Sequence, residues 1–350
     1  MSGGAEADAR AGGVATGPAA GDDAVLPFHL DRLDMRGRVV RLDATLDRIL
    51  SQHAYPPSVG ALVAEAALLT ALIGQAMKLR GRFSIQARAE DAAAPVALVA
   101  TDYFAPRAEG EVGRLRAYAH FSAERTPQTS PDPASLIGTG FFAMIIDQGP
   151  HMEPYKGVTP LIEGGLAASA ETYFAQSEQV ATRFQLAVGQ EESPGGGEAA
   201  WRGGGVMLQH LARVGEHVDE ASARGVSGRE AAEQGAQRLM RAEDVAALDG
   251  SEDAWRSAVM KLDTVEMMEL IGPHVSPERL LLRLFHEDEP RVFPAQPVAF
   301  GCTCSAAKVE TLLKSYPVGE IADMAEDGVI RADCQFCGAR YEFPLETLGD

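Results

Sequence analysis

The sequence predicts an α+β protein with an N-terminal α+β domain, a helical linker domain and a small C-terminal zinc domain that four cysteines hold. Strand-like alternation around one long apolar helix dominates the chain up to about residue 209. Helical periodicity replaces it after residue 216, and all four cysteines fall within residues 302–337. From these shifts we expect a disordered tail at 1–23, an α+β domain at 24–212, a helical linker domain at 213–292 and a cysteine domain at 293–350.

The composition bounds the class of protein. With 350 residues, of which 46% are hydrophobic and 23% charged, the chain is long enough for more than one packed core. A net charge of −19 disfavours nucleic acid and anionic membranes as partners, because both would approach an acidic surface. Residues 1–23 lack the basic start and the apolar run of a secretory signal, so we expect a cytoplasmic protein.

The pattern of the N-terminal region predicts a sheet with one buried helix. Phe83, Ile85 and Ala87 alternate with polar residues, which is typical of a half-buried strand. Similar runs predict strands at 96–101, 112–119, 141–147, 182–188 and 206–209. Between 61 and 77 the apolar residues recur every three or four positions, and this stretch is too short and too polar, with Glu65, to be a membrane span. It predicts a core helix.

Two segments after this helix carry weaker signals. Residues 191–205 contain Pro194 and many glycines, which predicts a surface loop or hairpin before the last strand. The region from Glu216 to Pro290 has helical spacing, as in Trp255, Val259, Leu262 and Val265. Three methionines there, Met260, Met267 and Met268, suit either ordinary core packing in a resting state or adaptable contacts with unfolded proteins. Core packing is the simpler interpretation.

The cysteines form one constellation. Cys302 and Cys304 make a C-x-C pair and Cys334 and Cys337 a C-x-x-C pair, with the 29 residues 305–333 between them. Two ligands from each pair suit a tetrahedral zinc site, one zinc per chain, and iron is the weaker alternative. Spacing alone leaves a structural role and a redox role equally open.

One physical argument favours a switch. A metal that ties the two pairs closes a loop of about 30 residues, a cross-link worth roughly 3–4 kcal/mol, and structural zinc contributes about 10–16 kcal/mol to folding in peptides. Disulfides between chain neighbours would replace little of that stabilisation. A domain of 58 residues, 293–350, is expected to unfold without its metal.

The chain resembles the redox-regulated chaperones of the 33 kDa heat-shock protein family from about Phe28 to its end. The cysteine segments carry most of the resemblance, since Ser305 follows the first pair and Gly338 and Tyr341 follow the second. Further matching stretches are Tyr55-Pro56, Tyr155–Val158, Tyr173-Phe174, Gln176–Gln179, Gly204-Gly205 leading to Gln209, and Arg283–Glu289. The chain departs from the family at Lys308, at Ala306-Ala307 and in its additional N-terminal tail.

The resemblance implies a function and a mechanism. It implies an ATP-independent holdase, not an enzyme, that binds unfolded or unfolding proteins under oxidative stress and is inactive when reduced and zinc-bound. By position it makes Cys302, Cys304, Cys334 and Cys337 the zinc ligands. It implies oxidation to two disulfides, Cys302 with Cys304 and Cys334 with Cys337, with zinc release, opening of the linker and dimerisation of the active form.

Two other classes of function remain alternatives. A zinc-ribbon regulator that binds nucleic acid or a protein partner should carry clustered basic residues, yet Lys308, Lys314 and Arg331 are diluted by acidic neighbours. A thiol oxidoreductase would need an exposed, metal-free C-x-x-C at Cys334 and Cys337. The chain has no nucleophile, metalloprotease or phosphate-loop motif, and Gly138-Thr139-Gly140 is typical of a turn.

Overall fold

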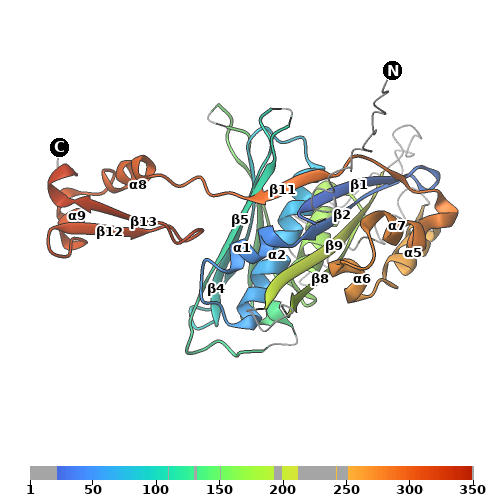
Figure 1. Cartoon of the computed structure of the whole chain (residues 1–350), viewed down its shortest axis with the longest axis horizontal. Coiled ribbons are helices and arrows are strands. Elements are labelled where there is room, and N and C mark those ends of the chain that lie inside the picture. Colours follow the sequence, from blue (N-terminus) through green and yellow to red (C-terminus); the bar gives the residue numbers. More distant parts are fainter. Residues whose placement is uncertain are drawn as a thin grey trace, which may run out of the picture.

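The chain forms a mixed α+β structure built on one large sheet, as the sequence predicts (Figure 1). The computed structural model describes residues 22–108, 110–129, 132–149, 151–192, 199–211, 242 and 251–348. The expected tail therefore lies almost wholly outside the described residues, as does the linker between 216 and 250 except for Ala242.

The large sheet has two antiparallel halves that a late strand joins. Across the sheet its strands are β7 (Tyr155–Pro160), β6 (Gly140–Asp147), β3 (Arg82–Ala89), β4 (Val96–Phe104), β5 (Gly113–Phe121), β11 (Gln296–Phe300), β1 (Ala24–Leu30), β2 (Met35–Leu42), β9 (Ala200–His210) and β8 (Thr182–Glu191), with β10 (Arg291–Val292) paired to β1. Strand β11 runs parallel to β5 at Val298–Phe300 and antiparallel to β1 at Gln296–Pro297. The segment that leads to the cysteines is thus fixed in the N-terminal sheet.

Helix α2 (Pro57–Ala76) forms the core of the molecule. It begins with Pro57 in its first turn, where the missing N–H costs nothing, and it buries Leu62, Leu69 and Ile73 completely. These side chains pack against both halves of the sheet. The helix is long and apolar enough to cross a membrane, but 78% of its most apolar stretch is buried within this core. The predicted buried helix is confirmed.

Two more helical segments accompany α2. They are α1 (Ala44–Leu50) and α3 (Gly165–Tyr173), the latter continued by a π-helical turn, η3 (Phe174–Glu178). Short 3-10 turns are η1 (Asp31–Leu33), η2 (Pro133–Leu136), η5 (His286–Asp288) and η6 (Leu345–Thr347).

A helical layer covers the other face of the β1–β2–β9 half. Its helices are α5 (Glu252–Leu262), α6 (Met267–Ile271) and α7 (Pro277–Phe285), grouped at one end of the molecule in Figure 1. Side chains of a strand alternate between faces, so Val206 and Leu208 face this layer while Met207 faces the α2 core. Trp255, Leu280 and Phe285 of the layer are fully buried against them. An apolar sheet face is therefore hidden beneath short helices.

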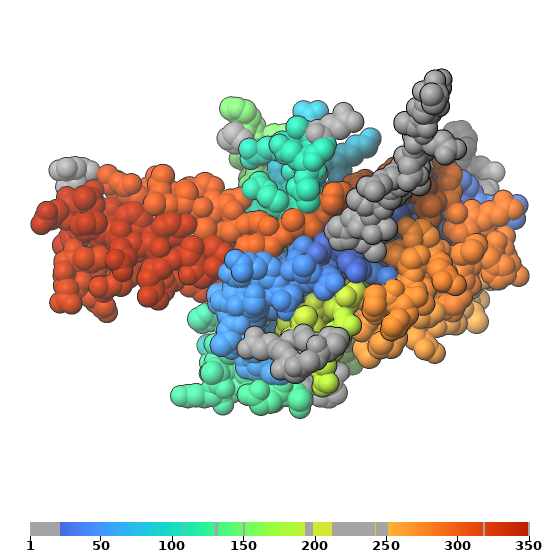
Figure 2. All heavy atoms as spheres, viewed as in Figure 1, coloured from blue at the N-terminus to red at the C-terminus, as the bar shows by residue number. Residues whose placement is uncertain are grey.

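A small C-terminal lobe projects from the body (Figure 2). It contains α8 (Ala306–Leu313), α9 (Val318–Asp323) and the hairpin β12 (Val329–Asp333) and β13 (Arg340–Pro344). Its own buried cluster comprises only Leu313, Ile321, Ile330, Phe343 and Leu348 among the described residues. So small a core agrees with the expectation that this region needs additional stabilisation.

Three sequence predictions were wrong in detail. The segment predicted as a loop or hairpin at 191–205 does join a hairpin of β8 and β9, but residues 200–205 belong to the buried strand β9, while 193–198 lie outside the described residues. The three methionines are not core residues, because Met260, Met267 and Met268 are 65%, 54% and 53% exposed and lie on two helices. Val265 follows the end of α5. The strands predicted at 83–88, 96–101, 112–119, 141–147, 182–188 and 206–209 are confirmed.

Candidate metal centre

The four cysteines reach one place from two separate segments. Cys302 and Cys304 lie in the extended chain between β11 and α8, and Ser305 then accepts a hydrogen bond from the Lys308 N–H to start that helix. Cys334 and Cys337 lie in the turn between β12 and β13. The hairpin brings its turn back to the body of the protein, and so the two segments meet.

Local hydrogen bonds shape the second segment. The Cys337 and Gly338 N–H groups donate to the Cys334 carbonyl at 3.3 and 2.8 Å, and the Cys334 N–H donates to the Ala339 carbonyl. Gly338 has φ of +64°, a left-handed conformation that glycine adopts without strain. This tight turn aims both sulfurs of the C-x-x-C pair to one side.

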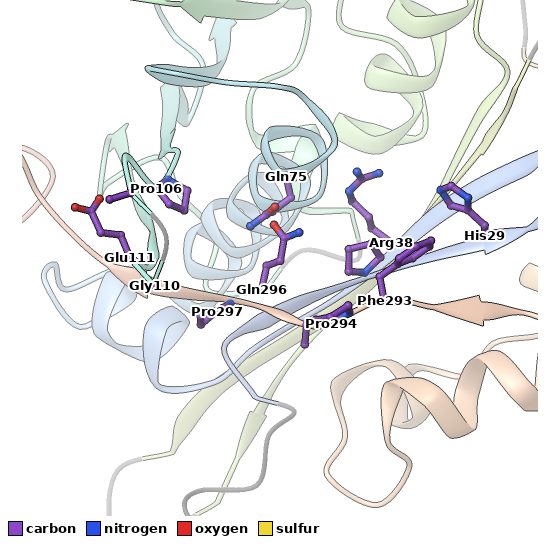
Figure 3. A pocket seen from close by; sticks show the side chains of 13 residues that line it. His29, Arg38, Gln75, Pro106, Gly110, Glu111, Phe293, Pro294, Gln296 and Pro297 are labelled. Atoms are coloured by element: carbon purple, nitrogen blue, oxygen red, sulfur yellow. The ribbon is translucent and has the colours of Figure 1, made fainter.

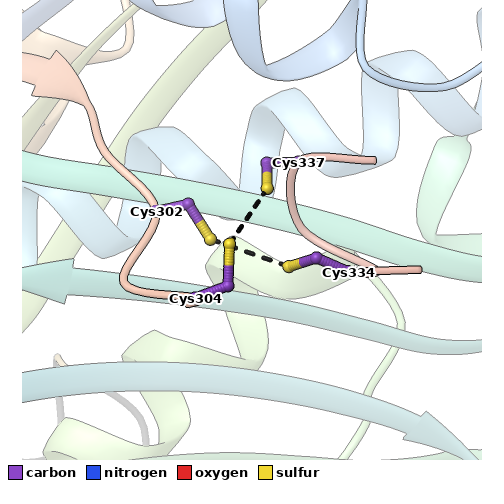
Figure 4. Close-up of side chains that lie close together, drawn as sticks. All are labelled: Cys302, Cys304, Cys334 and Cys337. Carbon is purple, nitrogen blue, oxygen red and sulfur yellow. Dashed lines mark hydrogen bonds between the residues drawn. The ribbon is translucent and has the colours of Figure 1, made fainter. Parts of the chain in front are cut away.

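The sulfur atoms form a compact cluster (Figure 4). Cys302 Sγ lies 3.7 Å from Cys334 Sγ and Cys304 Sγ lies 3.4 Å from Cys337 Sγ, while all four fall within 4.8 Å of one another. A tetrahedral zinc with Zn–S bonds of about 2.3 Å sets sulfurs roughly 3.8 Å apart. The four cysteines are free and partly buried, and they can hold a single metal ion.

The thiols differ in how readily they ionise. Burial raises the pKa of Cys302, but hydrogen bonds from the Cys304 N–H and the Arg116 guanidinium outweigh it and lower that pKa to about 7. Burial raises the pKa of Cys337 to about 12 and also raises that of Cys334. Cys302 is thus the thiol best prepared to act as a thiolate in the metal-free protein.

Neighbouring polar groups enclose the cluster. The Tyr341 hydroxyl donates to Cys304 Sγ at 3.1 Å, and the Lys308 ammonium donates to the Thr303 carbonyl at 2.6 Å. The hydrogen bond to Cys304 is the main reason that the pKa of Tyr341 rises to about 12.

Sequence reasoning missed the residues of the N-terminal sheet that touch this cluster. Arg116 of β5 donates to Cys302 Sγ at 3.5 Å, and the Phe336 ring packs against both Arg116 and Tyr118. The pattern held a signal, because Arg116 and Tyr118 alternate with the buried residues Leu115 and Ala117 of the predicted strand. They therefore had to lie on the opposite face.

A separate pocket lies beside the chain that enters the metal centre (Figure 3). Its volume is about 670 Å³, and Phe293–Pro297 form one wall, opposite Arg38 and Gln75. Burial lowers the pKa of Arg38 to about 10, and its Nε has no hydrogen-bond partner in the described part of the chain. Because the same wall continues through β11 into Cys302, pocket and metal centre share one segment.

Comparisons with known proteins agree with this architecture. Residues 23–344 match the family model described as Hsp33 protein. A 33 kDa chaperonin of Caulobacter vibrioides is 37% identical over 327 residues, covering 92% of this chain and 94% of the relative. One of Ectopseudomonas mendocina is 30% identical over 324 residues, covering 92% of each chain.

A solved structure shares the fold. The 33 kDa chaperonin of Thermotoga maritima superposes with a TM-score of 0.66 over 93% of this chain and 97% of the other, at 18% sequence identity. The fold and the site therefore define the class of this protein, an α+β protein with a C-terminal cluster of four cysteines. The chain belongs to the Hsp33 family.

Proposed function

We propose that this chain is a redox-regulated, ATP-independent holdase that binds unfolding proteins under oxidative stress. One observation carries the proposal. Four cysteines from two distant segments converge on a single metal-sized cluster, in a chain that also hides an apolar sheet face beneath short helices. A cross-link that controls folding and a concealed binding surface are the two parts that such a switch requires.

The resting form is proposed to be reduced and to hold one zinc ion per chain. Its proposed ligands are Cys302, Cys304, Cys334 and Cys337. The separations between their sulfur atoms suit tetrahedral coordination, and together they supply four thiolates. Zinc would join the C-terminal hairpin to the chain that leaves β11. The bound cysteines stay deprotonated, which is the form that oxidants attack.

Activation is proposed to be an oxidation of all four cysteines. Each disulfide forms from two thiols and one hydrogen peroxide, which is reduced to two waters while the sulfurs lose two electrons. The proposed pairs are Cys302 with Cys304 and Cys334 with Cys337. In the reduced arrangement the 3.7 and 3.4 Å sulfur contacts run across the two segments, but all four sulfurs lie within 4.8 Å of one another, so each local pair is also within reach. Zinc release would free the sulfurs to form these local bonds.

The proposed division of labour has three parts. Residues 24–212 contact clients, 213–292 form a metastable cover and 293–350 form the redox-sensing domain. The role of residues 213–292 as a cover is supported by the position of the short helices α5–α7, which bury Phe28 and Leu208 of the sheet. Opening this layer would expose apolar surface to unfolded chains. We propose cytoplasmic action, a homodimer as the oxidised form, and no catalysis.

The direct test is suppression of aggregation of a chemically unfolded client protein. Zinc-loaded, reduced chain should not suppress aggregation, whereas chain treated with peroxide under mild heating should do so at near-stoichiometric amounts without nucleotide. Cys334→Ser should bind zinc more weakly and lose this oxidant control, because three thiolates remain. Equal activity of reduced and oxidised protein would refute the redox switch, and disulfide mapping would decide the pairing.

A further inference from the structure

Strand β5 carries a buried ion pair directly beneath the cysteine cluster. Arg116 donates from Nε and Nη2 to Asp102 Oδ2 on the neighbouring strand β4, at 2.7 and 2.5 Å. Only 9% of Arg116 and 5% of Asp102 is exposed. The Ser84 hydroxyl also donates to Asp102, which fixes the carboxylate from a third strand. The guanidinium is therefore held in one orientation by the N-terminal sheet.

The free side of this guanidinium contacts both cysteine segments. Its Nη1 donates to Cys302 Sγ at 3.5 Å and to Thr303 Oγ1 at 3.3 Å. The Arg116 Cζ atom lies 3.8 Å from the centre of the Phe336 ring, and Phe336 belongs to the C-x-x-C segment. One arginine thus touches the C-x-C segment by hydrogen bonds and the C-x-x-C segment by a cation–π contact.

Two further contacts dock the C-x-x-C segment on the N-terminal domain. The Tyr118 ring meets the Phe336 ring edge to face, with centroids 4.7 Å apart. His53, which follows α1, lies with Nε2 2.7 Å from the Gln335 carbonyl oxygen. The turn between Cys334 and Cys337 is therefore seated on the body of the protein, although most of its lobe projects away (Figure 1).

The electrostatics explain why an arginine belongs here. Four thiolates around one divalent cation leave a net charge of about −2, which a nearby guanidinium stabilises in a partly buried site. Outer partners of metal ligands also orient them, and losing one typically lowers metal affinity about 10- to 100-fold. A lysine could not donate to Asp102 and face both cysteine segments at once, because it lacks the planar fork.

We infer that Arg116, anchored by Asp102, is a positioning residue of the metal centre supplied by the N-terminal domain. It holds the two cysteine segments together, so the zinc site of this chain is completed by β5 rather than by the C-terminal lobe alone. Loss of metal then frees the Cys334–Cys337 turn from its seat on β5. The inference rests on the proposed zinc-binding function.

The test measures zinc affinity of the full-length reduced chain by competition with a chromophoric chelator. Arg116→Gln should lower the affinity about 10- to 100-fold, and Phe336→Leu, which leaves the Arg116–Asp102 pair intact, should lower it in the same direction. Arg88→Gln, at an exposed arginine of β3, is the matched control and should bind zinc as the parent does. If the Arg116→Gln protein does not fold, the zinc affinity of the Phe336→Leu protein tests the inference.

Replacing zinc by cobalt provides a second measurement, the absorption spectrum of the metal site, which a general loss of protein stability would not shift. Because Arg116 donates to Cys302 Sγ, Arg116→Gln should shift the sulfur-to-cobalt charge-transfer band, whereas Arg88→Gln should not. Parent-like affinity and an unshifted band in both Arg116→Gln and Phe336→Leu would overturn the inference and leave the proposed function standing. If the parent chain itself binds neither zinc nor cobalt, the proposed function fails first.

Discussion

At the scale of single residues, the cysteine cluster is chemically uneven. Cys302 receives hydrogen bonds from the Cys304 N–H and from Arg116, while partial burial and the neighbouring thiols raise the pKa of Cys337. Metal would hide this difference by binding all four as thiolates. Once metal is lost, the order in which the thiols react depends on these local contacts.

We predict that Cys302 is the first cysteine to be alkylated when a chelator withdraws zinc from the reduced protein, in the interval before the C-terminal domain unfolds. Its pKa is lowered to about 7, so about half is thiolate at neutral pH, and the reaction rate should rise to its plateau as pH increases through that value. Cys337, with a pKa raised to about 12, should stay protonated and slow. Iodoacetamide labelling with peptide mapping between about pH 6 and pH 9 measures both.

The unfolded chain is the control for this order. In urea the hydrogen bonds to Cys302 are gone, and all four thiols should titrate near the ordinary value of about 8.5. Equal labelling of Cys302 and Cys337 in the first phase after zinc withdrawal, before unfolding, would show that the contacts of Arg116 do not set reactivity.

At the scale of elements, the sequence predicted the helices and strands whose formation depends on the spacing of nearby apolar residues. The helix around Leu62 and the strand around Ile85 were predictable because their apolar spacing has a helical or strand period. The C-x-C and C-x-x-C spacing likewise predicted that the four cysteines would meet. The helix and the strand depend on residues that are close together in the sequence. The cysteine cluster was predictable because a tetrahedral metal site needs four ligands and the chain has four cysteines.

Features set by distant partners were not predictable in the same way. The glycines at 203–205 favoured a loop or hairpin, yet they lie within strand β9, where neighbouring elements come too close for a side chain to fit. A Cβ at Gly204 would lie 2.0 Å from the Leu270 carbonyl oxygen of α6. The pairing of β11 between β5 and β1, and the seat of Phe336 on Arg116, also join residues that are far apart in the sequence.

Gly204→Ala should therefore release the helical layer without oxidation. The added methyl group meets backbone of α6, which cannot move aside as a side chain can, and such overpacking costs about 1–3 kcal/mol. Arg41, which donates to the Leu270 and Glu269 carbonyls at 3.1 and 2.8 Å, would lose its alignment with α6. Hydrogen exchange should show lost protection across 267–285 and retained protection across 62–73.

Gly189→Ala is a matched control on the neighbouring strand β8. Its Cβ would approach only the flexible end of the Ile271 side chain, at 3.2 Å, so α6 should stay in place. If the helical layer is the cover proposed above, reduced Gly204→Ala should suppress client aggregation while Gly189→Ala should not. A reduced Gly204→Ala protein with parent-like protection of 267–285 would contradict this view of α6.

At the scale of the whole molecule, one strap of chain connects the helical layer to the metal centre. Residues 286–301 leave α7, pair with β1 through β10, line the pocket beside Arg38, pass between β5 and β1 as β11, and reach Cys302. The strap is fixed at one end by the buried layer and at the other by the cysteine cluster. Strain or release at the cluster therefore has a covalent route to α7.

A tryptophan of the chain can report whether oxidation at the metal centre opens the helical layer. The chain contains two tryptophans, Trp201 on β9 and Trp255 on α5, and Trp255 is 1% exposed in the layer that covers the sheet. In a Trp201→Phe protein, peroxide with mild heating should shift the Trp255 emission to longer wavelength as the layer opens to water. Zinc release, measured with a chelating dye in the same sample, should precede or accompany this shift, because the cluster is where oxidation acts. Zinc with reductant should restore the original emission. If zinc leaves and holdase activity appears while Trp255 keeps its buried emission, the layer stays closed, and clients must bind elsewhere, with the seat of the Cys334–Cys337 turn on β5 the next surface to examine.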